Sequence, residues 1–350
     1  MKYFALTLTL LLVFSSLYGQ SSLLQNNDDN ATVNVVAYFC KGDTMKYRYV
    51  QGEYKVEKQD TVGNTYYEKE FIIVVTDSTP EGYKMELTPL SFRAGGDSVK
   101  QTGKQRMNRI VMENTLGTAV KFSTDENGSI LKVDNWRDVR DNYKKGVKHA
   151  LDSLYAQNAQ IDSFMPRKRI EALFELQILN EESIRQSIRE TEMLFDFHGM
   201  QLKVGNESFV DSTSSVYPAQ TNVIITYAKD ENYGADGDYA IDVTQHIVVP
   251  SEDLAPLAGM VLSTVLTDSL ADKTSKIMKD SIEAMAKGDS LTIDTKNSYY
   301  IFANGWPSIV QCLKSTDFYG TKKVEYQVIE WTYRSWRGYG LRDEDDNKEL

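Results

Sequence analysis

The spacing of hydrophobic residues changes four times along this chain, because it passes twice from the period of a strand to that of a helix and back again. Over residues 33–92 apolar and polar side chains alternate, as at Tyr47 and Tyr49, which places the apolar ones on one face of a β-strand. After residue 134 they recur every three or four residues, as in an amphipathic helix. Alternation returns from residue 202 onward. This order predicts an α+β fold, in which helices are inserted between two parts of an antiparallel sheet.

The helical period occurs in two places, at 136–199 and again at 251–288. In the first we expect three helices, which begin near Trp136, near Ile170 and at Asn180, a residue type that caps helices. The expected organisation is a leader peptide at 1–19, a polar stretch at 20–31, a β-rich half at 32–135, the helical segment at 136–199, a second β-rich half at 200–340 that contains the insertion, and a polar tail at 341–350.

One short pattern occurs in both β-rich halves. Asn127-Gly128 and Asn304-Gly305 are each preceded by Phe and followed by Ser and Ile. An Asn-Gly pair tolerates the positive φ that a tight hairpin turn requires. The pattern predicts a curved sheet made of two related half-barrel halves, each with such a turn; a chance similarity is the alternative.

Residues 1–19 have the pattern of a secretory signal peptide. Lys2 precedes an apolar run from Ala5 to Phe14, and small residues follow before Gln20. The run is shorter than the roughly 18 residues that span a bilayer. We therefore expect export to the periplasm, the exterior or the cell surface of a Gram-negative bacterium and no membrane span, with an uncleaved anchor or a buried helix as the alternative.

Composition limits the partners. The chain has 50 acidic and 39 basic residues and a formal net charge of −11, which opposes binding to nucleic acid or to an anionic membrane surface. Its 21 tyrosines and 13 phenylalanines favour strands, because aromatic side chains pack well on a pleated surface.

The best candidate for a metal site is an acidic loop. Asp230, Asn232, Asp236 and Asp238 alternate hard oxygen donors, which suit calcium. The loop departs from the EF-hand template because Ala235 stands where glycine is needed, so a solvated hairpin loop is the alternative. The three histidines lack zinc-site spacing. We expect no cofactor and assign no catalytic residue.

Four aromatic residues and two cysteines complete the candidates. Trp306, Trp331, Tyr333 and Trp336 predict a ligand-binding platform, with core packing as the alternative. Export permits a disulfide between Cys40 and Cys312. Two free buried thiols are the other interpretation.

Asp followed by Ser or Thr and then a methyl-bearing residue recurs along the chain. The acceptors that we consider are Thr44, Thr61, Ser78, Ser98 and Ser212. The pattern resembles the O-glycosylation sequon of exported Bacteroidetes proteins, and helix caps or turns would also explain it. With the cleavage region Leu17-Tyr18-Gly19-Gln20 and the turn Gly305-Trp306-Pro307, the chain resembles secreted β-rich proteins of Bacteroidetes, some of them similar to half-barrel carriers of the outer-membrane lipoprotein chaperone type. The resemblance implies no functional residue.

The alternation of aromatic sheet and apolar helices predicts an exported, non-catalytic binding protein. Its sheet concavity, covered by helices, would hold an apolar or amphipathic ligand such as a hydrophobic small molecule or a lipid. A structural or protein-interaction component of the cell envelope is the first alternative. A hydrolase without a recognisable motif is the second.

Overall fold

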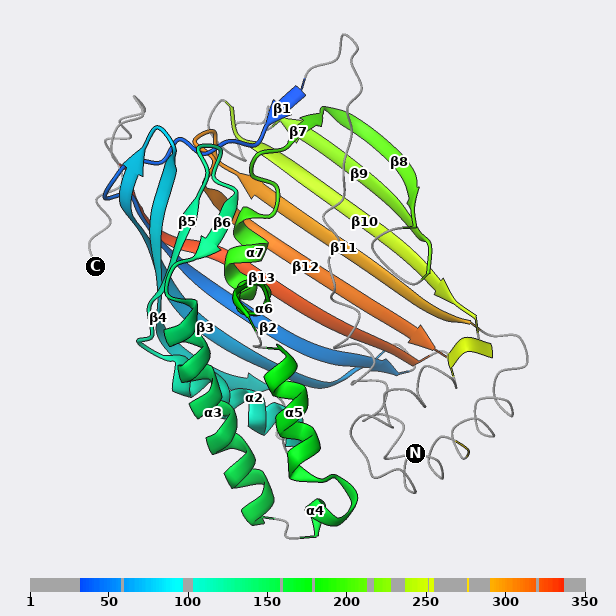
Figure 1. Ribbon diagram of the computed structural model, residues 1–350. Helices are drawn as coiled ribbons and strands as arrows, with labels where there is room; N and C mark the ends of the chain where they lie inside the picture. Colours follow the sequence, from blue (N-terminus) through cyan, green and yellow to red (C-terminus); the bar gives the residue numbers. More distant parts are fainter. Residues whose placement is uncertain are drawn as a thin grey trace.

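An eleven-stranded antiparallel sheet with a group of helices at one side forms the protein (Figure 1). This confirms the expected α+β class. The computed structural model describes residues 32–57, 60–96, 103–157, 160–177, 180–212, 217–227, 237–250, 252–254, 276, 290–318 and 321–336. The expected leader peptide and polar tail, and nearly all of the insertion at 251–288, lie outside these residues.

The strands follow two antiparallel runs that meet in the middle of the sheet. The first run is β2 (Thr44–Glu57), β3 (Asp60–Thr79), β4 (Gly82–Gly96), β5 (Val120–Thr124) and β6 (Ile130–Val133). The second is β8 (Gly205–Asp211), β9 (Ala219–Tyr227), β10 (Tyr239–Val249), β11 (Leu291–Ile301), β12 (Pro307–Phe318) and β13 (Thr321–Ser335). The last strand, β13, pairs with the first long strand, β2, which joins the runs into one sheet. The short strands β1 (Thr32–Asn34) and β7 (Gln201–Lys203) pair separately.

Helix α2 (Gly103–Thr115) lies between β4 and β5 within the first run. The helices that connect the two runs are α3 (Trp136–Gln157), α4 (Ile161–Phe164), α5 (Arg167–Gln177), α6 (Glu181–Ser187) and α7 (Arg189–Phe195). Asn180 caps α6 as expected, because its Oδ1 accepts a hydrogen bond from the Ser183 N–H at 2.9 Å. The single helix expected from Asn180 is wrong, however. The chain leaves helical geometry at Ile188 (φ −91°, ψ 74°), whose side chain is buried, and α7 continues in a separate segment.

The two faces of the sheet differ in what covers them. On one, which we call the helix-bearing face, Tyr47, Phe71, Tyr299 and Ile329 are buried in a single cluster that also takes in Phe195 of α7. Successive side chains in a strand point to opposite sides, so the neighbours of these residues lie on the other side, which we call the outer face. Ion pairs there, such as Arg48 with Glu330, are about half exposed.

Both Asn-Gly turns lie against the same extended segment, residues 35–39. The N–H of Ala37 donates to the carbonyl of Asn127 at 2.8 Å, and the N–H of Tyr38 donates to that of Asn304 at 3.0 Å. Gly128 and Gly305 both have positive φ, 98° and 89°. The two turns therefore pack on neighbouring residues of one segment, while common descent of the two halves stays a prediction.

Gly305 provides a first test of this packing. A Cβ there would lie 2.3 Å from the Val36 carbonyl oxygen, whereas a Cβ at Gly117 (φ +72°) would meet nothing within 4 Å. We expect Gly305→Ala to lower the free energy of unfolding by about 2 kcal/mol, from backbone strain and the clash together. Gly117→Ala, which adds strain alone, should cost about 1 kcal/mol. Urea unfolding measures both; equal costs would mean that the Val36 contact relaxes freely.

Candidate functional site

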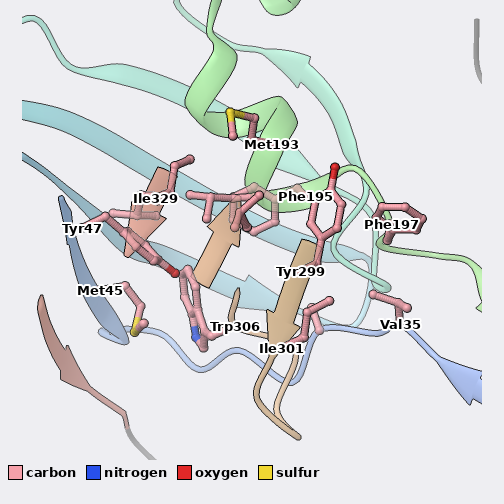
Figure 2. Packing of buried hydrophobic residues seen from close by; sticks show 14 of the residues in the cluster. Val35, Met45, Tyr47, Met193, Phe195, Phe197, Tyr299, Ile301, Trp306 and Ile329 are labelled. Carbon is pink, nitrogen blue, oxygen red and sulfur yellow. The ribbon is translucent and has the colours of Figure 1, made fainter. Parts of the chain in front are cut away.

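The part of the helix-bearing face beneath α7 is a closed core. Trp306 and Tyr47 have no exposed surface, and the Tyr47 hydroxyl donates to the carbonyl of Pro307 at 2.9 Å. The Trp306 ring lies 4.2 Å from that of Phe39 and 6.2 Å from that of Phe195. Figure 2 shows Met193 and Phe195 of α7 facing the strand residues of this cluster. Side chains therefore fill the space between α7 and the sheet, and no room is left there for a ligand.

A buried ion pair anchors α7 to the sheet. Lys69 of β3 is bonded to Glu190 of α7, and their side chains are only 9% and 7% exposed. The Lys69 ammonium also lies 5.9 Å from the ring centroids of both Tyr49 and Phe71, where an aromatic face attracts a cation. The pair fixes the position of α7 over the core.

Beyond α7, a polar band crosses the same face of the second run of strands. Thr221, Gln245 and Thr295 are direct cross-strand partners on β9, β10 and β11. On one side of them the face carries Val223 and Val243, which belong to the main core. On the other side a smaller cluster contains the apolar residues Val249, Leu254, Leu291, Tyr217, Ile247 and Ile293. We call this arrangement, two apolar patches with polar side chains between them, the divided face.

Two side-chain oxygens of the divided face are buried without a partner. Thr221 is 5% exposed, and neither its Oγ1 nor the Oδ1 of Asn297, a residue of β11 on the same face, has a hydrogen-bond partner in the structure. Burying such a group unpaired costs roughly 1–3 kcal/mol. These two atoms are therefore the groups in this part of the chain most in need of an added donor.

The outer face of the same strands carries an open groove of about 750 Å³. Two side-chain rows, in which neighbours are cross-strand partners, border it: Val210, Gln220, His246, Asp294 and Ser315 in the first, and Ser208, Asn222, Thr244, Lys296 and Leu313 in the second. Between the rows the groove is lined by Phe209, Thr221, Gln245 and Thr295. Their side chains point to the opposite face because successive residues of a strand alternate, so their backbone forms the floor. His246 Nδ1 lies 2.6 Å from Asp294 Oδ1, and Ser208 Oγ donates to Asn222 Oδ1 at 2.9 Å. We call this the outer groove.

The four aromatic candidates divide into a core residue and a surface cluster. Trp306 is part of the closed core described above. Trp331 and Trp336 pack on Phe302, with the Arg334 guanidinium 4.5 to 5.0 Å from the three ring centroids. The Trp336 Nε1–H donates to the sulfur of Met45 at 3.2 Å. Tyr333 is 44% exposed. The Arg334 guanidinium already lies over a face of the Phe302, Trp331 and Trp336 rings. A ligand-binding role for the four aromatic candidates stays a prediction.

The metal and cysteine candidates have separate positions. Asp230, Asn232 and Asp236 lie outside the described residues, while Asp238 is nearly buried and accepts the Ala303 N–H at 2.8 Å. In the parts of the chain that are described, no group of three or more His, Cys, Asp or Glu side chains could hold a metal ion. Cys40 and Cys312 are free thiols. Burial and the nearby Asp43 carboxylate both raise the pKa of Cys40.

The glycosylation candidates occur in mixed settings. Thr44 Oγ1 donates to the Gly42 carbonyl at 3.1 Å, and Ser78 Oγ donates to that of Phe39 at 3.1 Å. Thr61 in β3 and Ser212 after β8 are exposed, whereas Ser98 lies outside the described residues. Of these two hydrogen bonds only that of Thr44 is local, as in a turn, because Phe39 is distant from Ser78 in the sequence.

Comparison with known proteins adds little to these observations. No protein-family profile matches the chain, and no curated protein sequence does. A structure titled for lipid–protein interactions in lipovitellin aligns with 86% of this chain and 26% of its own, at 10% identity and a TM-score of 0.39. An outer-membrane channel from Pseudomonas putida F1 aligns with 89% of this chain and 100% of its own, at 8% identity and a TM-score of 0.15. The chain thus spans about a quarter of the lipovitellin chain, and neither score assigns a family. No helix in the described part of the chain is long and apolar enough to cross a membrane.

Proposed function

We propose that this protein is an exported, non-catalytic binding protein of the periplasm or cell surface that holds an amphipathic ligand on its divided face. The observation that carries the proposal is the pair of buried, unpartnered oxygens, Thr221 Oγ1 and Asn297 Oδ1. A ligand with apolar parts would lie on the two patches, and its polar group would donate to these oxygens. The signal-peptide pattern of residues 1–19 supports the proposed export.

The position of the ligand differs from that expected between sheet and helices. The part of the helix-bearing face that α7 covers is packed with side chains, among them Trp306 with no exposure. On the divided face, Val243, Ile247 and Ile293 keep part of their surface exposed. The proposal therefore assigns binding to the second run of strands, beyond α7.

Binding of a fluorescent fatty alcohol tests the proposal. We expect the purified protein to bind cis-parinaryl alcohol saturably, and to bind it more tightly than a hydrocarbon probe of equal length without a polar group, because only the alcohol has a hydroxyl that can donate a hydrogen bond to the unpartnered oxygens. Absence of saturable binding of either probe would exclude the divided face as a site for amphipathic ligands.

The substitution Thr221→Val separates binding from stability. Valine keeps the shape of threonine and removes the unpaired hydroxyl, so the free energy of unfolding should rise by about 1 kcal/mol while the affinity for cis-parinaryl alcohol falls about fivefold. Thr226→Val, at an exposed position on the opposite side of the same strand, is the control. A Thr221 variant with unchanged affinity would show that the hydroxyl does not meet the ligand.

A further inference from the structure

The outer groove lies on the face opposite the divided face and requires an explanation of its own. Its polar side chains fall into two kinds. His246 with Asp294 and Ser208 with Asn222 bond to each other across neighbouring strands, which fixes the walls. Gln220, Thr244 and Lys296 line the same groove and make no side-chain hydrogen bond or ion pair in the described structure. An amide, a hydroxyl and an ammonium are therefore available to a ligand.

A row of aromatic residues continues the groove across the sheet. Leu313 of the second row is the cross-strand partner of Tyr326 on β13, which pairs in turn with Gly52 on β2. Gly52 pairs with Tyr66 on β3, and Tyr66 with Gly95 on β4. Tyrosine and glycine thus alternate along one line, which we call the tyrosine ledge.

The two rings of the ledge lie flat on the glycines beside them. A Cβ at Gly52 would stand 2.3 Å from Tyr326 Oη and 2.4 Å from its Cζ, and one at Gly95 would stand 2.5 Å from Tyr66 Cζ. Only glycine leaves room for a ring against the backbone. Both tyrosine side chains stay partly exposed, and the Tyr326 ring also lies 6.2 Å from that of Tyr54.

From this juxtaposition we propose that the outer groove and the tyrosine ledge bind an extended glycan chain. A pyranose ring has one face of C–H groups, which packs on the electron-rich face of an aromatic ring, and a rim of hydroxyls suited to Gln220, Thr244 and Lys296. Neighbouring strands lie ~4.8 Å apart, close to the length of one sugar unit in an extended chain. Each strand would therefore contact one sugar unit, through its side chain in the first row and its side chain in the second row.

A peptide fits this surface less well. Peptides that bind sheets add to an exposed edge, where unpaired backbone groups hydrogen-bond to them. The groove crosses β8 to β12. Strands β9 to β12 are paired on both sides, and only β8 lies at the edge of the sheet, so most of the floor has no backbone groups left for a peptide strand. A glycan fits better, because it is recognised through its sugar rings and hydroxyl groups and needs no backbone partners.

Binding of a glycan array by the full, folded protein tests the proposal. The probes are linear β-1,4-linked oligosaccharides of glucose, N-acetylglucosamine, mannose and xylose, immobilised and then titrated in solution. We expect at least one series to bind, with an affinity that rises with chain length until about eight units, one for each strand from β8 across β13 and β2 to Tyr66 on β3.

Variants locate the site and separate it from the divided face. Thr244→Val and Tyr326→Ala should each weaken binding about tenfold, whereas Tyr326→Trp, which keeps a flat ring, should retain it. Thr226→Val, on the outer face but away from the groove lining, and Thr221→Val, on the divided face, should leave glycan affinity unchanged. Circular dichroism melting establishes that each variant is folded.

Three results would overturn the inference. They are binding to no glycan on the array, binding that a single sugar unit saturates as well as a pentamer, and binding that Thr244→Val and Tyr326→Ala both leave intact. Weakened binding of the fatty alcohol in Thr221→Val together with unchanged glycan binding would support both sites separately. The failure of either proposal is thus distinguishable from the failure of the other.

Discussion

Glu190→Gln is expected to lower the free energy of unfolding by about 3–5 kcal/mol, because it leaves the Lys69 ammonium buried without its counter-charge. The two side chains are 9% and 7% exposed, so water cannot replace the lost carboxylate. The Tyr49 and Phe71 rings 5.9 Å away compensate for only part of the desolvation. Urea unfolding followed by far-UV circular dichroism measures the change.

Two further variants identify the cause of this loss. Glu330→Gln breaks the Arg48 ion pair on the outer face, whose side chains are 45% and 44% exposed, and should cost less than about 1 kcal/mol. The double variant Lys69→Met/Glu190→Leu removes both buried charges and should be more stable than Glu190→Gln alone. A Glu190→Gln variant no more costly than Glu330→Gln would mean that α7 is held by its apolar contacts instead.

Alternation of apolar residues predicted most strands of both runs, but not β8, in which only Phe209 and Val210 are large apolar residues. In the central part of β2 and of β3 every second residue is buried in the core, as Tyr47 and Tyr49 are in β2 and Phe71 and Ile73 are in β3, which is the period of a strand. The pairing of β13 with β2 depends on contacts between the two ends of the chain, and no local pattern specifies which distant strands become neighbours. The sequence therefore predicts strands and class, while the single eleven-stranded sheet comes from the structure.

The break between α6 and α7 shows the same limit for helices. Ile184, Ile188 and Phe195 follow a helical spacing, and all three are buried. Spacing alone therefore indicates one continuous helix. The chain nevertheless leaves helical geometry at Ile188, and α7 lies on the sheet with Glu190 bonded to Lys69. Tertiary contacts decided this boundary against local preference.

The divided face and the outer groove were not predicted, although the sequence contains one sign of the divided face. Thr221 and Asn297 occupy positions where alternation requires a core residue, next to Val223 and Tyr299. A polar residue in such a position marks a buried group that needs a partner. The outer groove has no equivalent trace, because Gln220, Thr244 and Lys296 fall on the solvent side, where polar residues are the norm.

The stability of the protein is expected to fall in mild acid because of His198, which lies between the two Asn-Gly turns. Its Nε2 lies 2.9 Å from the carbonyl oxygen of Gly305, which can only accept, so Nε2 carries the proton of the neutral ring. The Nδ1 atom is buried with no hydrogen-bond partner in the structure. Burial therefore opposes a second proton and lowers the pKa of His198 from 6.5 to about 4.

The sign of the effect follows from proton binding in the two states. Between pH 6.5 and about 4 the imidazole is protonated in the unfolded chain but neutral in the folded one, so acid favours unfolding. The free energy of unfolding should fall by about 3 kcal/mol as the pH decreases through this range, and this contribution should stay constant at lower pH.

His198→Gln isolates this contribution from that of the carboxylates, which titrate in the same range. Glutamine keeps an N–H donor for the Gly305 carbonyl and has no proton to gain, so its stability should depend less on pH by about the same 3 kcal/mol. His149→Gln, which removes an imidazole from an exposed position, controls for the substitution itself. Free energies of unfolding from urea titrations between pH 4 and 7 would give the difference. Parallel curves for His198→Gln and the unmodified protein would mean that acid opens the turns and solvates the ring before unfolding.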